Sequence, residues 1–404
     1  MHKAKKASGL AFVLVMALGL SSAVYASNYK EGEVIVKYKD GISRSRTDMN
    51  ALYKLAGVKH VNHFSGTMKG LDLVILADGV KTQDGIAAFQ MSSSVEYAQP
   101  NYILRLFPDA NHSNDGGIPC IPGFDIPGCD RSAPTPCLLP GIPFPPGCDD
   151  GGGGGGENPT PPPGPTPPPA TRPALQPAPA DVVPPVADPD LGKAYGLAKI
   201  GATEAWTEHR GVKEFIVADI DTGIDYNHED LAFNIWRGKT DDGKDSAGFD
   251  FVHNDGLPFD DNQHGSHTAG TIGAVGGNGK GVSGVIQRVS LMSLKFLSGE
   301  GSGTTADAIK AIDFAVVHGA KVLSNSWGGK GDDGNAALKE AVERAKAKDV
   351  LFIAAAGNDG TDNDGSDPAY PASFNNDNMI AVAATDDKDG MAYFSNYGKK
   401  TTHL

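Results

Sequence analysis

Positive charge is scarce in this chain of 404 residues, because 35 Lys and Arg stand against 49 Asp and Glu, for a net charge of -14. No basic cluster occurs beyond the first few residues, so nucleic acid is not an expected partner. The apolar run from Leu10 to Leu20 is shorter than the about 20 residues that span a bilayer, which disfavours a membrane anchor. Lysines before this run and the residues Val24-Tyr25-Ala26 after it predict a secretory signal over residues 1–26. We therefore expect a secreted or periplasmic protein.

Cysteine is also scarce, and all four cysteines lie in one stretch rich in proline and glycine. No C-x-x-C pair is present and no histidine lies among them, which disfavours metal binding as the alternative to disulfides. Because their number is even in an exported chain, we expect two disulfides, with three pairings open. The cysteines are Cys120, Cys129, Cys137 and Cys148.

Residues 27–107 have the size of a small domain. Their apolar patterns predict the order β-α-β-β-α-β, which is the split βαβ form of an α+β domain. An unrelated small domain is the alternative, because this order is common among proteins of different function. The expected strands are Glu33–Lys39, His60–Ser65, Leu71–Leu76 and Val95–Leu106, and the expected helices are Thr47–Ala56 and Thr82–Met91.

Residues 108–190 differ sharply in composition and include the hexaglycine Gly151–Gly156 and a proline-rich run from Pro161 to Pro165. Such a stretch cannot bury enough apolar surface to offset the entropy of ordering it. We therefore expect a disordered linker, flexible in its glycine half and extended in its proline half.

Residues 191–404 alternate apolar strands with helical patterns, which predicts an α/β fold with a parallel sheet and helices on both faces. Sites in such sheets form at the carboxyl ends of the strands, where Asp221 and Asn358 are expected. The expected strands are Glu214–Asp221, Val289–Phe296, Lys321–Asn325, Val350–Ala356 and Met379–Ala384, and the expected helices are Thr305–His318 and Asn335–Lys348.

A carboxylate and a histidine stand in positions typical of nucleophilic catalysis. Asp221 ends an apolar run, and His264 opens a glycine-flanked helix start 43 residues later (264 minus 221). The carboxylate would hold the imidazole in one tautomer and stabilise its charged form. The imidazole would take a proton from a serine. Asp-Thr-Gly alone is a weak signal, but its combination with His-Gly-x-His is specific.

These motifs, Asp221-Thr222-Gly223 and His264-Gly265-Ser266-His267, resemble those of subtilases, the subtilisin-like serine proteases. The resemblance makes His264 the base and leaves His267 a structural helix residue. The segment from Val95 to Tyr102 resembles the end of the inhibitory propeptide of subtilases. The resemblance therefore implies a monomeric serine endopeptidase made as a zymogen, with its own propeptide in the active-site cleft and polypeptides as substrates.

The serine motif Gly-Thr-Ser-x-Ala is absent from the 404 residues. We therefore expect residues 191–404 to be a subtilisin-like domain without its C-terminal part, with the nucleophile beyond Leu404. The alternative is a non-catalytic remnant of the same fold that binds peptides or acts like an inhibitor.

The resemblance also assigns an oxyanion donor and a substrate groove. A preorganised side-chain amide stabilises the charge that develops on the carbonyl oxygen, and Asn358 is the candidate. An extended peptide adds to exposed strand edges, so the groove would hold its main chain. The expected groove residues are Gly301, Ser302, Gly303, Ser326, Trp327, Gly328, Ala355, Ala356 and Gly357.

Calcium is the cofactor that the resemblance implies. Asp230 matches one calcium position, with Asn278 as a further oxygen ligand, and Asp250 and Asp255 resemble a second site. Hard oxygen ligands from loops suit calcium. The alternative is that these are solvated acidic loops in an acidic chain.

Asp219 departs from the family pattern, in which an apolar residue is typical at this position. Residues i and i+2 of a strand share a face, so Asp219 and Asp221 are expected near each other. Like charges at that range raise one pKa. The alternative is that backbone amides or a cation satisfy Asp219.

Overall fold

The structure is a computed structural model that describes residues 28–107, 118–119, 129–130, 172–181, 185–240, 243–330 and 335–404. The expected signal over residues 1–26 and most of the expected linker lie outside these residues. Of the four cysteines only Cys129 lies within them, in β6 (Cys129–Asp130), which pairs in parallel with β5 (Ile118–Pro119). The two disulfides therefore stay a prediction.

The N-terminal domain has the split βαβ order that its sequence predicts. Its four strands form an antiparallel sheet in the order β4-β1-β3-β2. Val34 and Val36 pack in the domain's own core, whereas Ile35 between them faces the core of the C-terminal domain, so both faces of the sheet are buried. The elements are β1 (Tyr29–Tyr38), α1 (Arg46–Leu55), β2 (Val58–His63), β3 (Leu71–Leu76), α2 (Thr82–Gln90) and β4 (Val95–Leu106).

Six parallel strands form the main sheet of the C-terminal domain, in the order β10-β11-β7-β13-β15-β17. The five expected strands and two expected helices are all present close to their expected bounds. The edge strand β10 (Gly248–Asp250) is too short to leave a recognisable pattern. The strands are β7 (Gly211–Asp221), β11 (Arg288–Lys295), β13 (Val322–Asn325), β15 (Leu351–Ala355) and β17 (Met379–Val382), and the helices include α3 (Tyr195–Lys199), α4 (Ala202–Glu208), α5 (His264–Gly273), α6 (Thr305–Val317) and α7 (Ala336–Lys346).

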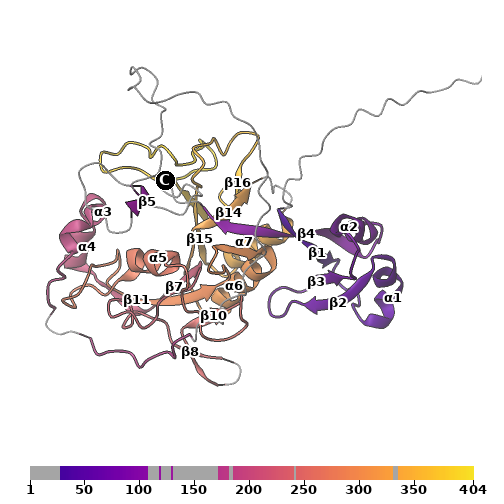
Figure 1. The fold of residues 1–404 in the computed structure, drawn as a ribbon, viewed down its shortest axis with the longest axis horizontal. Helices are drawn as coiled ribbons and strands as arrows, with labels where there is room; N and C mark the ends of the chain where they lie inside the picture. Colours follow the sequence, from indigo (N-terminus) through magenta and orange to yellow (C-terminus); the bar gives the residue numbers. More distant parts are fainter. Residues whose placement is uncertain are drawn as a thin grey trace, which may run out of the picture.

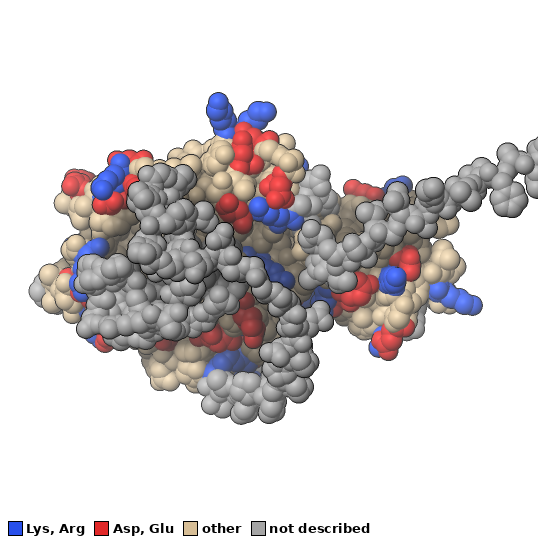
Figure 2. Space-filling model, turned by 45° about the horizontal axis from the view of Figure 1, so that its top comes forward, with Lys and Arg blue, Asp and Glu red and all other residues tan. Residues whose placement is uncertain are grey.

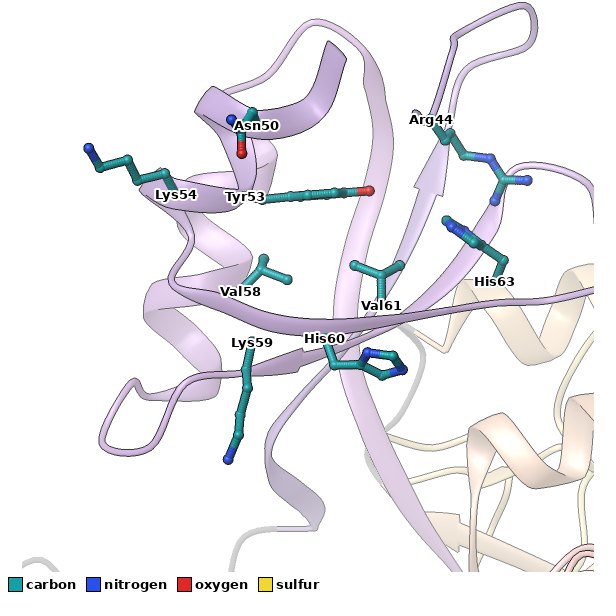
Figure 3. Close-up of a pocket in the computed structure, with 9 residues that line it drawn as sticks. All are labelled: Arg44, Asn50, Tyr53, Lys54, Val58, Lys59, His60, Val61 and His63. Atoms are coloured by element: carbon teal, nitrogen blue, oxygen red, sulfur yellow. The ribbon is translucent and has the colours of Figure 1, made fainter. Parts of the chain in front are cut away.

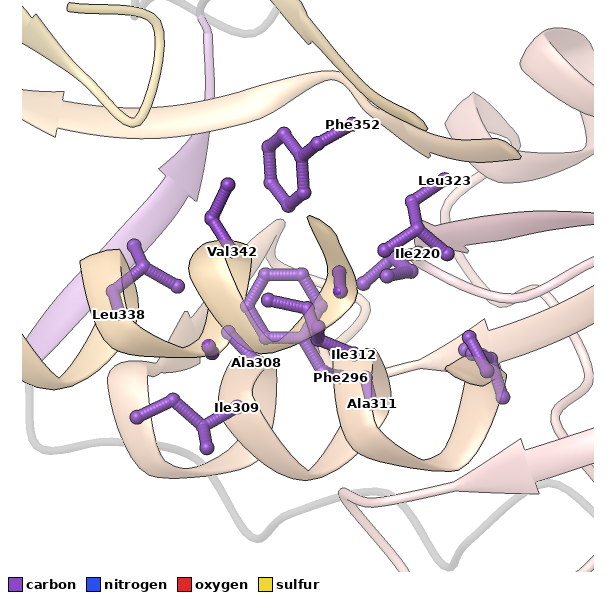
Figure 4. Packing of buried hydrophobic residues seen from close by; sticks show 14 of the residues in the cluster. Ile220, Phe296, Ala308, Ile309, Ala311, Ile312, Leu323, Leu338, Val342 and Phe352 are labelled. Carbon is purple, nitrogen blue, oxygen red and sulfur yellow. The ribbon is translucent and has the colours of Figure 1, made fainter. Parts of the chain in front are cut away.

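Helices cover both faces of this sheet, as parallel strands require. Ala218 and Ile220 of β7 belong to the core that β7 shares with α6 and α7 (Figure 4). Val217 lies in the opposite core, with α5. Because side chains alternate along a strand, Asp219 and Asp221 share the α5 face with Val217.

Two buried amides of β4 join the domains by capping helices. Asn101 Oδ1 accepts the Ala306 N–H at 2.9 Å at the start of α6, and Gln99 Oε1 accepts the Ala337 N–H at 3.0 Å at the start of α7. The first N–H groups of a helix have no partner within it, so these caps fix β4 on the C-terminal domain. In Figure 1, β4 runs from the N-terminal domain into the larger body beside β14 (Trp327–Lys330).

The surface mixes charges of both signs. On the face shown in Figure 2, acidic and basic side chains are interspersed over the described residues. None of the helices that the structure describes is both long and apolar enough to cross a membrane.

Candidate active site

Asp221 and His264 are in contact at the carboxyl edge of the parallel sheet. Asp221 ends β7 and His264 begins α5. His264 Nδ1 lies 2.8 Å from Asp221 Oδ1 and 3.0 Å from Oδ2. The Asp221 side chain is 1% exposed and the imidazole 21%, so a buried carboxylate holds a partly accessible base. With Nδ1 bound to the carboxylate, Nε2 is the nitrogen that can take a proton from a nucleophile.

The turn after β7 interlocks with the start of α5. Asp260 accepts the Thr222 hydroxyl at 2.9 Å and the Ser266 N–H at 2.9 Å. Thr222 Oγ1 in turn accepts the Gly265 N–H at 3.0 Å. A Cβ on Gly265 would lie 2.0 Å from the carbonyl oxygen of Gly223, so only glycine allows this approach. These contacts hold the carboxylate and the imidazole at hydrogen-bonding distance.

Lys295 lies beneath the same turn and was not among the expected site residues. It ends β11, pairs with Asp221 across the strands and is fully buried. Its Nζ donates to the carbonyls of Thr222 at 2.6 Å and Leu297 at 2.9 Å and forms an ion pair with Asp261. A lysine inside an apolar strand is the sequence signal for it, because lysine is almost never fully buried unless paired.

Asp219 is buried on the same face of β7 as Asp221. Its oxygens lie 3.2 and 3.0 Å from Oγ1 of Thr268, one turn after His264 on α5. Burial raises the pKa of Asp219 well above its ordinary value, and Asp221 adds to this. Its partners are the hydroxyls of Thr268 and Ser324, where the alternative expected backbone amides or a cation.

Asn358 lies on the same sheet edge as Asp221, because it follows β15 and both β7 and β15 flank β13. The residues before it, Ala355–Gly357, are held by the loops that follow. The Ala356 carbonyl accepts the Asn363 amide at 2.8 Å, and the Gly357 carbonyl accepts the Asn396 N–H at 2.8 Å. These contacts position the turn that carries Asn358, and its role as oxyanion donor stays a prediction.

Strand β4 lies between β12 (Ser302–Thr304) and β14 and is antiparallel to both. Against β12, Leu104 is opposite Gly303, and the Leu106 N–H donates to the Gly301 carbonyl at 2.9 Å. The expected groove segment Gly301–Gly303 therefore lies along the main chain of an extended segment. Such pairing holds a peptide by its backbone whatever its side chains.

The other side of β4 lies along β14, which follows directly after Ser326. Trp327 is opposite Leu106 and is itself buried. Phe107, the residue after β4, packs on Gly328, since a Cβ built on Gly328 would lie 2.5 Å from the Phe107 ring. Phe107 and Leu104 are buried while Arg105 between them is exposed, so the C-terminal domain covers the apolar side chains at the end of β4.

The profile of the subtilase family matches residues 212–403, and that of the fervidolysin N-terminal prodomain matches residues 19–101. Thermitase of Thermoactinomyces vulgaris is 40% identical over 208 residues, which cover 51% of this chain and 67% of thermitase. Subtilisin DY of Bacillus licheniformis is 36% identical over 204 residues, which cover 50% of this chain and 68% of that protein. This chain belongs to the subtilase family. The expectation of a subtilase with an N-terminal propeptide is confirmed.

The fold of this subtilase also matches a solved structure. Fervidolysin of Fervidobacterium pennivorans, a keratinolytic enzyme related to subtilisin, superposes with a TM-score of 0.57 at 21% identity, over 90% of this chain and 44% of fervidolysin. At this identity the match establishes the fold alone. A thermophilic serine proteinase of Bacillus sp. (strain AK1) is 39% identical over 51% of this chain, and the chain spans 47% of its length.

Two of the expected calcium ligands of this subtilase lie together. Asp230 accepts the Asn278 side-chain amide at 2.8 Å and the Val282 N–H at 3.0 Å. Burial raises the pKa of Asp230, and the charge of Asp188, which accepts the Asn278 N–H at 2.9 Å, raises it further. Asp188 and Asp230 are therefore two buried carboxylates beside Asn278, and calcium at this place stays a prediction. In the described part of the chain no group of three or more His, Cys, Asp or Glu could hold a metal ion.

The other two expected ligands, Asp250 and Asp255, hold a guanidinium instead. Arg172 Nη1 donates to Asp250 Oδ2 at 2.7 Å, and Arg172 Nη2 donates to Asp255 Oδ2 at 2.6 Å. A cationic side chain between the two carboxylates neutralises the charge that would attract calcium. In the structure Arg172 lies between the two carboxylates, and a metal at this pair stays a prediction.

The subtilase propeptide also carries a cavity of about 460 Å³ between α1 and β2 (Figure 3). It is lined by basic side chains such as Arg44 and Lys59, which are paired with Asp72 and Asp78. Its lining contains none of the residues of the candidate active site.

Proposed function

We propose that this subtilase is an exported serine endopeptidase made as a zymogen, and that it hydrolyses peptide bonds in polypeptides. Asp221 and His264 act with a serine that lies beyond Leu404. Residues 1–26 direct export, and the N-terminal domain is the propeptide. The contact between Asp221 and His264, together with the extended strand β4 that pairs with both β12 and β14, supports this proposal most directly.

Catalysis proceeds by acyl transfer. The serine Oγ attacks the carbonyl carbon of the substrate while its proton passes to Nε2 of His264. Asp221 stabilises the imidazolium through Nδ1. The Asn358 amide donates to the oxyanion, which contributes about two to three orders of magnitude in rate. The proton then moves from His264 to the leaving amine, and water resolves the acyl-enzyme by the same route.

Strand β4 inhibits the uncut chain because it uses both edges of the substrate groove. Its main chain pairs with β12 and β14, so a polypeptide substrate cannot pair with them. The caps from Gln99 and Asn101 hold β4 there through the surfaces of α6 and α7. Removal of the N-terminal domain frees the groove.

Calcium binds Asp230, with Asn278 as a further oxygen ligand, and it stabilises the fold without a part in the reaction. The raised pKa of Asp230, caused by burial and by Asp188, supports this, because a cation would relieve the repulsion between the two carboxylates.

The test uses the full-length gene product, including the codons after Leu404, and measures hydrolysis of denatured casein. We expect His264→Ala to lower the rate by several orders of magnitude, because the serine loses its base. His267→Ala is the matched control, since His267 lies on the same helix but is exposed, and it should keep the activity.

The alternative is a non-catalytic protein that keeps the groove and binds peptides. A gene without Gly-Thr-Ser-x-Ala after codon 404, or a full-length product with no His264-dependent hydrolysis, would establish that alternative.

A further inference from the structure

Part of the expected linker is bound to the C-terminal domain. We name residues 172–181 and 185–190 the strap. Asn227 holds its first part on both sides, because its amide donates to the Ala174 carbonyl at 2.9 Å and its carbonyl accepts the Gln176 N–H at 2.9 Å. The Pro173 carbonyl accepts the hydroxyl of the buried Tyr226. These contacts attach this part of the expected linker to the C-terminal domain.

The later part of the strap pairs with a glycine-rich loop. The Val186 N–H donates to the Gly277 carbonyl at 2.9 Å, and the Val186 carbonyl accepts the Gly279 N–H at 3.1 Å. The buried Asp188 carboxylate accepts the N–H groups of Gly277 at 2.7 Å and of Gly279 at 3.1 Å. At the end of the first part, Asp181 forms a two-point ion pair with Arg288.

Arg172 makes the densest contacts of the strap. Its guanidinium reaches Asp250 and Asp255 and also donates to the Leu257 carbonyl at 3.1 Å. Asp250 is fully buried, and the His253 ring is its only other side-chain partner among the contacts described. Asp250 and Asp255 also exchange backbone hydrogen bonds, at 2.7 and 3.1 Å, which brings the two carboxylates to one place.

A buried carboxylate needs a compensating charge, and here that charge comes from the chain itself. Arginine suits the position because its planar fork serves two carboxylates at once. Removing one partner of such a pair leaves a buried charge uncompensated, which is strongly destabilising.

We propose that the strap is a permanent part of the mature subtilase, and that Arg172 supplies the positive charge that a metal ion would otherwise bring to Asp250 and Asp255. It follows that processing of the precursor leaves Arg172 on the catalytic domain. The proposal does not depend on whether the domain is catalytic.

The first test is thermal unfolding of the full chain, with calcium chloride or with a chelator, for the wild type, Arg172→Ala and Arg172→Lys. We expect Arg172→Ala to lower the Tm by roughly 5–10 °C. We expect calcium to restore part of that loss, beyond its effect on the wild type, because the carboxylate pair is then free to bind it. Arg172→Lys should fall between the two, since it keeps the charge and loses the fork.

Arg288→Ala is the matched control, because it breaks another ion pair of the strap, in which a single carboxylate takes part. Its loss of Tm should not respond to calcium beyond the wild-type effect. An Arg172→Ala variant with the wild-type Tm, or one with no additional response to calcium, overturns the proposed role of Arg172.

The second test needs no variant. Limited digestion of the wild-type chain with an added protease, followed by N-terminal sequencing of the resistant core, should give a core that still contains Arg172. A resistant core that begins after Asp190 shows that the strap is dispensable and overturns the proposal, even if the variants fail to fold.

Discussion

The Asp219–Thr268 contact lies beside the Asp221–His264 contact and joins the same two elements. Asp219 precedes Asp221 by two residues in β7, and Thr268 follows His264 by four residues in α5. Strand residues two apart share a face, and helix residues four apart lie one turn apart on the same side. The two pairs are therefore successive contacts between one strand and one helix. The Thr268 hydroxyl also reaches the Gly265 carbonyl at 3.0 Å, so this second contact supports the turn that carries His264.

Asp219→Asn should raise the Tm at neutral pH and leave proteolytic activity nearly intact. Burial and Asp221 raise the pKa of Asp219 in the folded chain, whereas in the unfolded chain it titrates near pH 4. Between these pKa values the folded chain binds a proton that the unfolded chain releases, so stability falls as pH rises through this window. Asparagine has no proton to lose, and its Oδ1 can still accept from the Thr268 hydroxyl.

The measurement is the Tm of both proteins from pH 4 to pH 8. The advantage of Asp219→Asn should be largest at the upper end and shrink toward pH 4. A constant difference across this range contradicts the raised pKa of Asp219, and a large loss of turnover in the variant contradicts a merely structural role for its carboxylate.

Lys295→Met should destabilise the fold by about 2–5 kcal/mol, because two buried carbonyls lose their donor. The Asp-Thr-Gly turn rests on Lys295, so we also expect lower activity at the temperature where the variant is still folded. Lys310→Met is the control, since Lys310 pairs with Asp307 on the same helix and is 40% exposed. Denaturant unfolding should place the control within about 1 kcal/mol of the wild type. If both variants lose the same free energy of unfolding, the buried contacts of Lys295 do not contribute more to stability than an exposed ion pair does.

The sequence predicted the elements whose apolar period is regular, because burial on one face imposes that period. The predicted bounds of β4 are the same as the observed ones, and the Asp221–His264 pair was predicted from two short motifs. The contacts that the sequence did not predict join residues that are distant from each other in the chain. Arg172 lies in a segment of linker composition, and nothing near it in the sequence shows that its guanidinium reaches Asp250.

The contacts of the strap could not be predicted from its amino-acid composition, for a physical reason. Its contacts are mostly main-chain hydrogen bonds and ion pairs, which leave no apolar period in the sequence. Asp219 shows the same limit, because the strand period predicted which face it lies on but not that Thr268 is its partner.

Chelation of calcium should lower the Tm of the wild type. A ligand at about 100 times its Kd stabilises by about 2.7 kcal/mol, which corresponds to roughly 5–10 °C for a domain of this size. Asp230→Asn should abolish the difference between calcium and chelator, whereas Asp255→Asn should keep it. The readout is thermal unfolding by circular dichroism. If the Tm of the wild type does not change when chelator is added, this subtilase does not bind a stabilising calcium ion.

The two caps from β4 should each contribute to the stability of the uncut chain. Asn101→Ala leaves the Ala306 N–H without its acceptor at the start of α6, at a cost of about 1–2 kcal/mol. Gln99→Ala should have a similar effect at α7. Glu96→Ala is the control, because Glu96 lies on the same strand and is exposed. We also expect the cap variants to show more activity before processing, since β4 is held less firmly. Cap variants that match the control in Tm would exclude this role.

The end of β4 predicts which peptides the processed enzyme prefers. Residues 104–107 have the sequence Leu-Arg-Leu-Phe, in which Leu104 and Phe107 are buried against the C-terminal domain and Arg105 is exposed. In a peptide of this sequence, the enzyme should therefore prefer leucine at the first position and phenylalanine at the fourth. It should tolerate a change at the second position. In peptide anilides of this sequence, alanine in place of the first leucine should lower kcat/KM about 10–200-fold, as loss of apolar contact in a pocket does. Alanine in place of phenylalanine should cost at least as much, because the Phe107 ring fills the space over Gly328. Alanine in place of arginine should change kcat/KM less than threefold, which is roughly the effect of a side chain in solvent. An enzyme that cleaves casein but treats the four peptides alike would keep the proposed activity and refute this assignment of the groove.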